Sequence, residues 1–591
     1  MNCLKNSFSV ICKEIPFLVI FSFLISFPIP YMLWYKFNQY EILWILFASE
    51  GILSRYCLGG CITVFLMFIW GKHFSKAKYV LYFIAILYFA IVFFLINVFS
   101  MELSPLVFNM IMETNMDEAA GFFSTFFFTK GAVKTYIYIL GIIALICIAE
   151  KYRNKYCLMR CNNRIISFFV VFIAIFLLNG LRAMKAHVAL FKCNTLQEIN
   201  SWDRAYGPIA LYDAFDVMLF STYYEVVLRN QMQVSINNTK NVESAGRTNE
   251  NVNVVFVLGE SFIKWHSSLY GYYRNTNPNL AREKDKGNLF LFNDVITPFN
   301  NTMETERNIF SCNSMLDGEQ WPDAPIFQAV FKKAGFNVYM WDILRNPDSH
   351  DLGDISTNTL LYSKDILSIY DGLNSKSFSY DGQLIDDFKK MNIEKRNKSN
   401  LIIFHLTGQH VPFSDRYPPR RDFSKFTNSN PSAKVFLTDE MKKAINDYDN
   451  ATLYNDWVMK QIIEEFKDYN TVIIYFSDHG EEVYDYRNSM GRTISPPDGL
   501  ADEWLKYEFE IPFMIWCSDT YIQKNKDVID NIKVSRDKPF MTDVVYQLLF
   551  HVAGINTSLY NSQRDVINDN FQVRDRILGN KINFDRIRKN K

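Results

Sequence analysis

Long apolar stretches crowd the first 180 residues of this 591-residue chain. A helix needs about 20 mostly apolar residues to cross the hydrocarbon core of a bilayer. Five stretches have a suitable length, namely residues 17–35, 42–70, 79–99, 133–149 and 165–181. We interpret residues 42–70 as one long or broken helix, although two short segments there would give six spans. Residues 1–181 are therefore predicted to form a helical membrane domain with about five transmembrane helices.

The charges of the loops predict how this domain is oriented. The link after Trp70 and the segment 150–164 are rich in Lys and Arg, whereas residues 100–129 carry acids and neither Lys nor Arg. Basic loops stay on the cytoplasmic side of a membrane. These assignments alternate correctly for five spans and a cytoplasmic N-terminus. Everything after Leu181 is then expected outside the cytoplasm.

The composition excludes some classes of protein. The chain balances 62 Lys+Arg against 62 Asp+Glu, which argues against a nucleic-acid partner because such proteins carry a basic excess. Cys193, Cys312 and Cys517 are the cysteines of the exported part, too few for a disulfide-stapled domain. We expect residues 182–250 to be a linker with amphipathic helices. Its segment 209–228 fits either an interfacial helix on the bilayer or a helix packed on the soluble domain.

The predicted soluble domain, residues 251–591, alternates short apolar runs with helix-like stretches. The runs are residues 253–258, 337–341, 401–406, 471–476 and 511–516. Strands buried on both faces and separated by helices are typical of an α/β domain with a mostly parallel central sheet. Functional residues of such sheets gather just beyond the carboxyl ends of the strands.

Acidic and imidazole side chains follow three of these runs. Glu260 follows the first run, His410 lies shortly after the third, and Asp478 and His479 follow the fourth. Oxygen and nitrogen ligands of this kind hold Zn²⁺ in tetrahedral geometry. The alternative is that Glu260 caps a helix and Asp478 forms an ion pair. His405, at the end of the third run, is interpreted as a buried core histidine.

Four separated segments make the sequence resemble bacterial phosphoethanolamine transferases, which are inner-membrane enzymes that decorate lipopolysaccharide. The segments are ETNMDEAA (113–120), GESFIKWHSSLYGYYRNTNPNL (259–280), HLTGQH (405–410) with RYP (416–418), and SDHGEEVYD (477–485). The resemblance implies about five spans, a periplasmic linker, and a catalytic domain of the alkaline phosphatase and sulfatase superfamily in the periplasm. A formylglycine sulfatase is not expected, because the chain lacks a Cys-x-Pro-x-Arg motif.

The resemblance also implies a set of site residues. Zn²⁺ would be held by Glu260, Asp478, His479 and a nucleophilic threonine, with one ion expected and a second left open. Thr302 is favoured as the nucleophile over Thr305, since it begins a predicted helix whose backbone N–H groups can bind phosphate oxygens.

Further residues are implied at the substrate. His410 and Glu481 match family positions near the metal and the transferred group, and Thr114 and Glu118 match positions at the lipid donor. The role of His266, structural or functional, stays open. The implied reaction moves phosphoethanolamine from phosphatidylethanolamine to lipopolysaccharide through a covalent threonine intermediate.

The acceptor is predicted from departures from the family pattern. Relatives that modify lipid A carry a further histidine after the Asp-His motif and several periplasmic disulfides, whereas this chain has no histidine between His479 and His551. Both departures favour a core sugar over lipid A. The alternatives are another envelope phosphotransferase, such as a glycerol-phosphate transferase, or a non-catalytic envelope scaffold.

Overall fold

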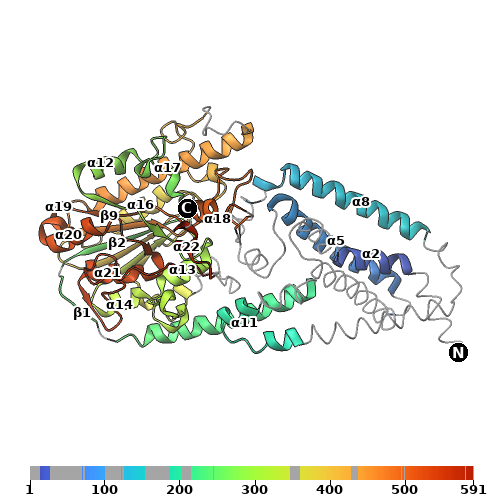
Figure 1. Ribbon diagram of the computed structural model, residues 1–591, viewed down its shortest axis with the longest axis horizontal. Helices are drawn as coiled ribbons and strands as arrows, with labels where there is room; N and C mark the ends of the chain where they lie inside the picture. Colours follow the sequence, from blue (N-terminus) through green and yellow to red (C-terminus); the bar gives the residue numbers. More distant parts are fainter. Residues whose placement is uncertain are drawn as a thin grey trace. The chain divides into compact units, whose positions relative to one another are not determined.

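A computed structural model gives the structure of the protein (Figure 1). It describes residues 14–26, 70, 74–99, 122, 125–152, 185–202, 214–243, 245–249, 251–345, 360–427, 437–493, 496–497, 499–579 and 581–589. The chain divides into two compact units, residues 1–230 and 231–591. The domain boundaries predicted at 181 and 250 stay predictions.

The first unit contains three described helices that pack together through apolar side chains. They are α2 (Ile15–Ser26), α5 (Phe74–Phe99) and α8 (Lys130–Tyr152). Among the described residues, α5 and α8 are long and apolar enough to cross a membrane. The predicted spans at 42–69 and 165–181 lie outside the described residues, so the number of five spans stays a prediction.

A buried ion cluster joins one end of these three helices. The ammonium group of Lys78 lies 2.8 Å from Oε2 of Glu14 and 2.5 Å from Oε2 of Glu150. These residues lie at the start of α2, near the start of α5 and near the end of α8. A buried lysine requires such partners, because an unpaired charge is costly away from water. The cluster lies at the end that the loop charges assign to the cytoplasm.

The second unit is built on a seven-stranded sheet with the order β3-β9-β8-β2-β7-β5-β6. Its strands are β2 (Asn253–Gly259), β3 (Leu289–Phe292), β5 (Asn337–Asp342), β6 (Gly372–Leu373), β7 (Asn400–His405), β8 (Thr471–Ser477) and β9 (Phe513–Cys517). The five predicted runs all form strands. The sheet is mixed, however, since β9 runs antiparallel to β8 and β3 antiparallel to β9. The prediction of a mostly parallel sheet was wrong because a fully buried apolar run has no readable direction.

Helices cover both faces of this sheet (Figure 1). On one face lie α12 (Pro278–Lys286), α16 (Asp381–Lys390) and α17 (Asp439–Phe466), and on the other α14 (Phe327–Lys333) and α21 (Val545–Ala553). The central strand β2 alternates between the two cores. Val255 and Val257 pack in the cluster that includes α16 and α17, while Phe256 contacts Phe310 and Phe327 on the opposite face. Both faces of β2 are therefore buried away from water. Because a slip of one residue would exchange the side chains of the two faces, this packing fixes the register of the strand.

The linker ends in a long helix, α11 (Ala214–Lys240), whose C-terminal part belongs to the second unit. There the side chain of Asn238 donates to the carbonyl of Pro322 at 2.9 Å, and Thr239 accepts a backbone N–H at 3.2 Å. This part of the helix packs on the soluble domain. The two interpretations of segment 209–228 are not decided by these contacts, because they lie beyond its end.

We expect Phe256→Ala to destabilise the soluble domain by about 3–5 kcal/mol, since it removes a fully buried ring from the centre of the sheet. The thermal unfolding midpoint of the detergent-solubilised protein, followed by circular dichroism, measures the change. Val534→Ala is the matched control because Val534 is 70% exposed. Equal midpoints for the two variants would contradict the packing described for β2.

Candidate metal centre and active site

Ionisable side chains line up at the carboxyl ends of four neighbouring parallel strands. Asp342 ends β5, His405 ends β7, Glu260 follows β2, and Asp478 and His479 follow β8. All five side chains are buried. The sheet therefore brings together residues that are as much as 219 positions apart in the chain, counted from 260 to 479.

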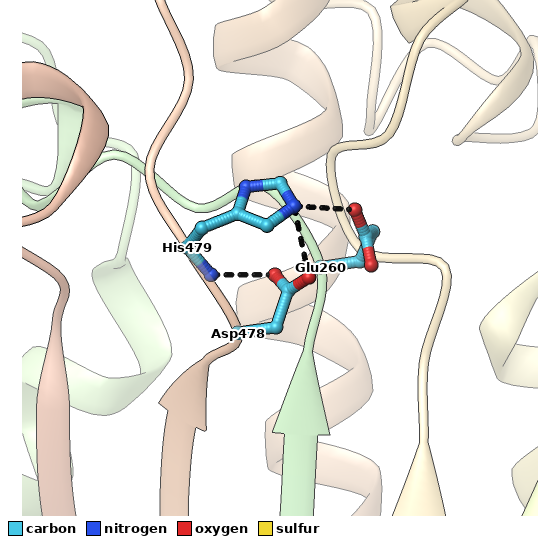
Figure 2. A group of neighbouring side chains, drawn as sticks. All are labelled: Glu260, Asp478 and His479. Atoms are coloured by element: carbon cyan, nitrogen blue, oxygen red, sulfur yellow. Dashed lines mark hydrogen bonds and ion pairs between the residues drawn. The ribbon is translucent and has the colours of Figure 1, made fainter. Parts of the chain in front are cut away.

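Three of these side chains form a tight cluster (Figure 2). Nε2 of His479 lies 3.3 Å from Oε1 of Glu260 and 2.9 Å from Oδ2 of Asp478. One ligand atom from each residue lies within 4.8 Å of the other two. The structure thus brings together the three residues that the sequence predicted as metal ligands.

The orientation of His479 is that of a metal-binding imidazole. Its Nδ1 donates to the carbonyl of Gly480 at 2.8 Å, so its Nε2 points toward the two carboxylates. Oδ2 of Asp478 is buried and makes no hydrogen bond. Burial and Arg492 lower the pKa of His479, but Asp478 and Glu260 raise it overall to about 9. The two carboxylates that stabilise a proton on His479 would also stabilise a bound cation.

Thr302 completes the cluster from a helix. It is the first residue of α13 (Thr302–Phe310), and its Oγ1 lies 3.2 Å from Oε1 of Glu260 and 3.1 Å from Nε2 of His479. The side chain of Asn301 caps this helix by accepting from a backbone N–H. The unpaired N–H groups of the first turn therefore face the same region as the threonine hydroxyl.

Thr305, the second candidate nucleophile, points elsewhere. It is fully buried, and its Oγ1 donates to the carbonyl of Phe299 at 3.1 Å. It also lies 3.5 Å from the hydroxyl of Thr297. These contacts give Thr305 a structural position behind the first turn of the helix.

The four clustered groups fit a zinc ion. Tetrahedral zinc with bonds of ~2.0 Å to oxygen and nitrogen keeps its ligands about 3.3 Å apart. The close pairs formed here by Glu260, Thr302, Asp478 and His479 are separated by 2.9–3.3 Å. Three oxygen donors and one nitrogen donor are a suitable set for this metal.

Two glycines let the surrounding loops approach this cluster. Gly408 has a φ of +52°, and a Cβ there would lie 2.7 Å from the carbonyl oxygen of Glu260. A Cβ on Gly480 would lie 2.1 Å from the carbonyl oxygen of Tyr507. Larger residues at these positions would push apart the segments that carry the site.

The other predicted residues of the soluble domain lie at the same edge. Nδ1 of His410 donates to the carbonyl of Val411, and burial lowers the pKa of His410 to about 4 despite the nearby carboxylate of Glu260. His410 is therefore neutral near pH 7. Oε2 of Glu481 lies 3.3 Å from Nε of Arg492. Thr114 and Glu118 lie outside the described residues, and their donor role stays a prediction.

Arg492 is a site residue that sequence reasoning did not assign. Its guanidinium contacts a ring nitrogen of His479 and donates to the carbonyl of Asn300 at 3.1 Å. The loop after Gly480 brings it back to His479. Nothing in the spacing of a long polar loop signals which of its cations returns to the site.

His266 and His405, two further histidines of the family motifs, are buried among acids. Nδ1 of His266 lies 2.7 Å from Asp449, and its Nε2 lies 3.1 Å from Asp485. His405 was predicted to be a core histidine, and it is buried, but it too lies between carboxylates, those of Asp342 and Glu306.

The pKa of His266 predicts a pH dependence of stability. Burial lowers this pKa, but Asp485 and Asp449 outweigh burial and raise it from 6.5 to about 10. The folded protein thus holds a proton that the unfolded chain releases, so this stabilisation is complete below about pH 6.5 and is lost as the pH rises toward 10. We expect the unfolding midpoint of the protein to fall over this range more steeply than that of His266→Gln. Parallel pH profiles would contradict a charged His266.

The fold and the site define a hydrolase-like α/β domain with a metal-binding edge. The sulfatase family matches residues 252–555, which is more than half of the chain, and the chain belongs to this family. It is also similar to the phosphoethanolamine transferase EptC of Escherichia coli O18:K1:H7 (strain RS218 / NMEC), with 30% identity over 343 residues. That match covers 56% of this chain and 56% of EptC, so the chain spans about half the length of the curated relatives it matches.

Solved structures extend this similarity to the membrane part. The C-terminal periplasmic domain of EptC from Escherichia coli aligns with a TM-score of 0.50 and 27% identity, over 58% of this chain and 97% of that domain. The integral membrane lipooligosaccharide phosphoethanolamine transferase A of Neisseria meningitidis aligns with a TM-score of 0.56 and 16% identity, over 93% and 97% of the two chains. The second alignment shows a shared fold along nearly the whole chain.

Proposed function

We propose that this protein transfers phosphoethanolamine from phosphatidylethanolamine to lipopolysaccharide, as a multi-pass enzyme of the bacterial inner membrane with its catalytic domain in the periplasm. The observation that carries the proposal is the position of the Thr302 hydroxyl, at a helix N-terminus and within 3.2 Å of both Glu260 and His479. The similarity to named phosphoethanolamine transferases supports the same group for transfer.

In the proposed first step, Oγ1 of Thr302 forms a bond to phosphorus and the bond from phosphorus to the diacylglycerol oxygen breaks. The proton of the Thr302 hydroxyl ends on the diacylglycerol oxygen as that group leaves. In the second step, an acceptor hydroxyl takes the phosphoethanolamine group and Thr302 regains its proton. Zinc, when bound, supplies Lewis-acid activation by lowering the pKa of a hydroxyl at this position.

Cations and N–H groups around Thr302 suit the charge of the transferred group. The first turn of α13 presents unpaired backbone N–H groups, and the guanidinium of Arg492 lies next to His479. Both can meet the oxygens of a phosphoryl group as negative charge develops on them. Neutral His410 and the carboxylate of Glu481 lie close by, and Glu481 carries a charge suited to the ammonium group of ethanolamine.

For the acceptor we propose a core sugar rather than lipid A. The loop after the Asp-His motif carries Arg492 at the site instead of the histidine expected in the lipid A branch. The cysteines Cys193, Cys312 and Cys517 are all free. At the donor, we propose that Glu118 and Thr114 bind the headgroup of phosphatidylethanolamine. A non-catalytic scaffold is disfavoured because the four candidate metal ligands, including the hydroxyl of Thr302, lie close together.

We expect Thr302→Ala to abolish transfer, because Thr302 supplies the oxygen that bonds to phosphorus. Mass spectrometry of lipid A and core fractions, from cells producing each variant, detects the added phosphoethanolamine and identifies the acceptor. Thr305→Ala is the matched control and should retain transfer. Transfer by Thr302→Ala would exclude Thr302 as the nucleophile. A mass increment of glycerol phosphate instead of phosphoethanolamine would show that the proposed donor is wrong.

Arg492→Ala should lower the rate of transfer by about 10–100-fold, the effect of about 1.4–2.7 kcal/mol of lost transition-state stabilisation. Arg492→Lys should keep part of the activity, since it preserves the charge but not the forked geometry. Zinc content measured in parallel should equal that of the wild type. An unchanged rate in Arg492→Ala would remove this residue from the active site.

A further inference from the structure

A second group of buried metal-ligand atoms lies beside the first and shares Glu260 with it. One ligand atom each from Glu260, Glu306 and His405 lies within 4.8 Å of the other two. His405 ends β7 and His479 follows β8, and these strands flank β2 on either side. The carboxylate of Glu260 therefore lies between two imidazoles that approach it from opposite neighbours in the sheet.

His405 is oriented like a metal ligand with its supporting carboxylate. Its Nδ1 lies 3.0 Å from Oδ1 of Asp342, which is itself fixed by the hydroxyl of Tyr362 at 2.7 Å and by the backbone N–H of Leu344 at 2.8 Å. Imidazoles that bind metals characteristically donate their second N–H to such a carboxylate. Nε2 of His405 is thereby directed at Glu306.

The facing atoms of this second group form an ion pair with each other but no well-formed hydrogen bond. Oε1 of Glu306 and Nε2 of His405 lie 3.0 Å apart, but the pair does not have the geometry of a hydrogen bond, and neither atom has another hydrogen-bond partner. Glu306 is 4% exposed and His405 is 1% exposed, so solvent does not compensate them. A buried ion pair that lacks good hydrogen-bond geometry recovers its desolvation cost poorly, and a bound cation would contact both atoms.

We propose that Glu260, Glu306 and His405 form a second divalent-cation site, with Glu260 bridging two ions. One imidazole and two carboxylates are donors that suit zinc. Paired ions that share a carboxylate are a recurring arrangement in phosphoryl-transfer sites. Glu306 lies one helical turn after Thr302 on α13, so an ion held there would also fasten this helix to the sheet edge.

The inference reaches beyond the proposed transfer reaction, and its test does not require that reaction. Full-length protein in detergent is equilibrated with a zinc-buffered solution, and bound zinc is measured by inductively coupled plasma mass spectrometry. We expect two equivalents in the wild type and one in Glu306→Gln. Glu304→Gln is the matched control on the same helix and should keep two. Asp478→Asn should lose the other ion and hold one.

A different result overturns the second site. One equivalent in the wild type that is retained in Glu306→Gln would show that His405 is a protonated imidazole held between Asp342 and Glu306. Anomalous diffraction at the zinc edge from wild-type crystals tests this without a variant, because two peaks beside Glu260 are expected and a single peak contradicts the proposal. Two bound ions in a protein that does not transfer phosphoethanolamine would contradict only the proposed function. One bound ion in a protein that does transfer it would contradict only the second site.

Discussion

Repulsion among buried carboxylates at one edge of the sheet is the constraint that organises this domain. Parallel strands β5, β7, β2 and β8 end side by side, and three of them deliver Asp342, Glu260 and Asp478 to a region shielded from water. Like charges this close are tolerated when imidazoles, a guanidinium or a metal compensate them. His405, His479 and, in the loop after β8, Arg492 are the groups that compensate these carboxylates.

Helix α13 also brings positive charge to these carboxylates. Its N-terminus carries the partial positive charge of the helix dipole, and its first residue places a hydroxyl against Glu260 and His479. Glu306, one turn later, contacts His405. The helix is thus held at two points by the ionisable groups of the sheet edge, and this attachment fixes the distance from the Thr302 oxygen to the cluster.

Sequence reasoning located most of the candidate site because its residues directly follow readable strands. Apolar runs identify β2 and β8, and the acids and imidazole that follow them are adjacent in the chain to the strand ends. The same reasoning did not single out Glu306, a ligand of the proposed second site, because a lone acid on a short helix carries no sequence signal. It also could not assign Arg492 within a polar loop. Strand direction was also beyond reach, since β9 is as apolar as its parallel neighbours.

Histidine 405 illustrates why burial alone is a poor guide to role. Its place at the end of an apolar strand predicts a residue inside the domain, and the structure agrees. The sequence cannot show what lies across from it, because Asp342 and Glu306 arrive from a neighbouring strand and a distant helix. A buried imidazole against apolar side chains would be neutral and inert. The same imidazole between two acids must carry a proton or a metal, and so the partners, set by the topology of the sheet, decide its chemistry.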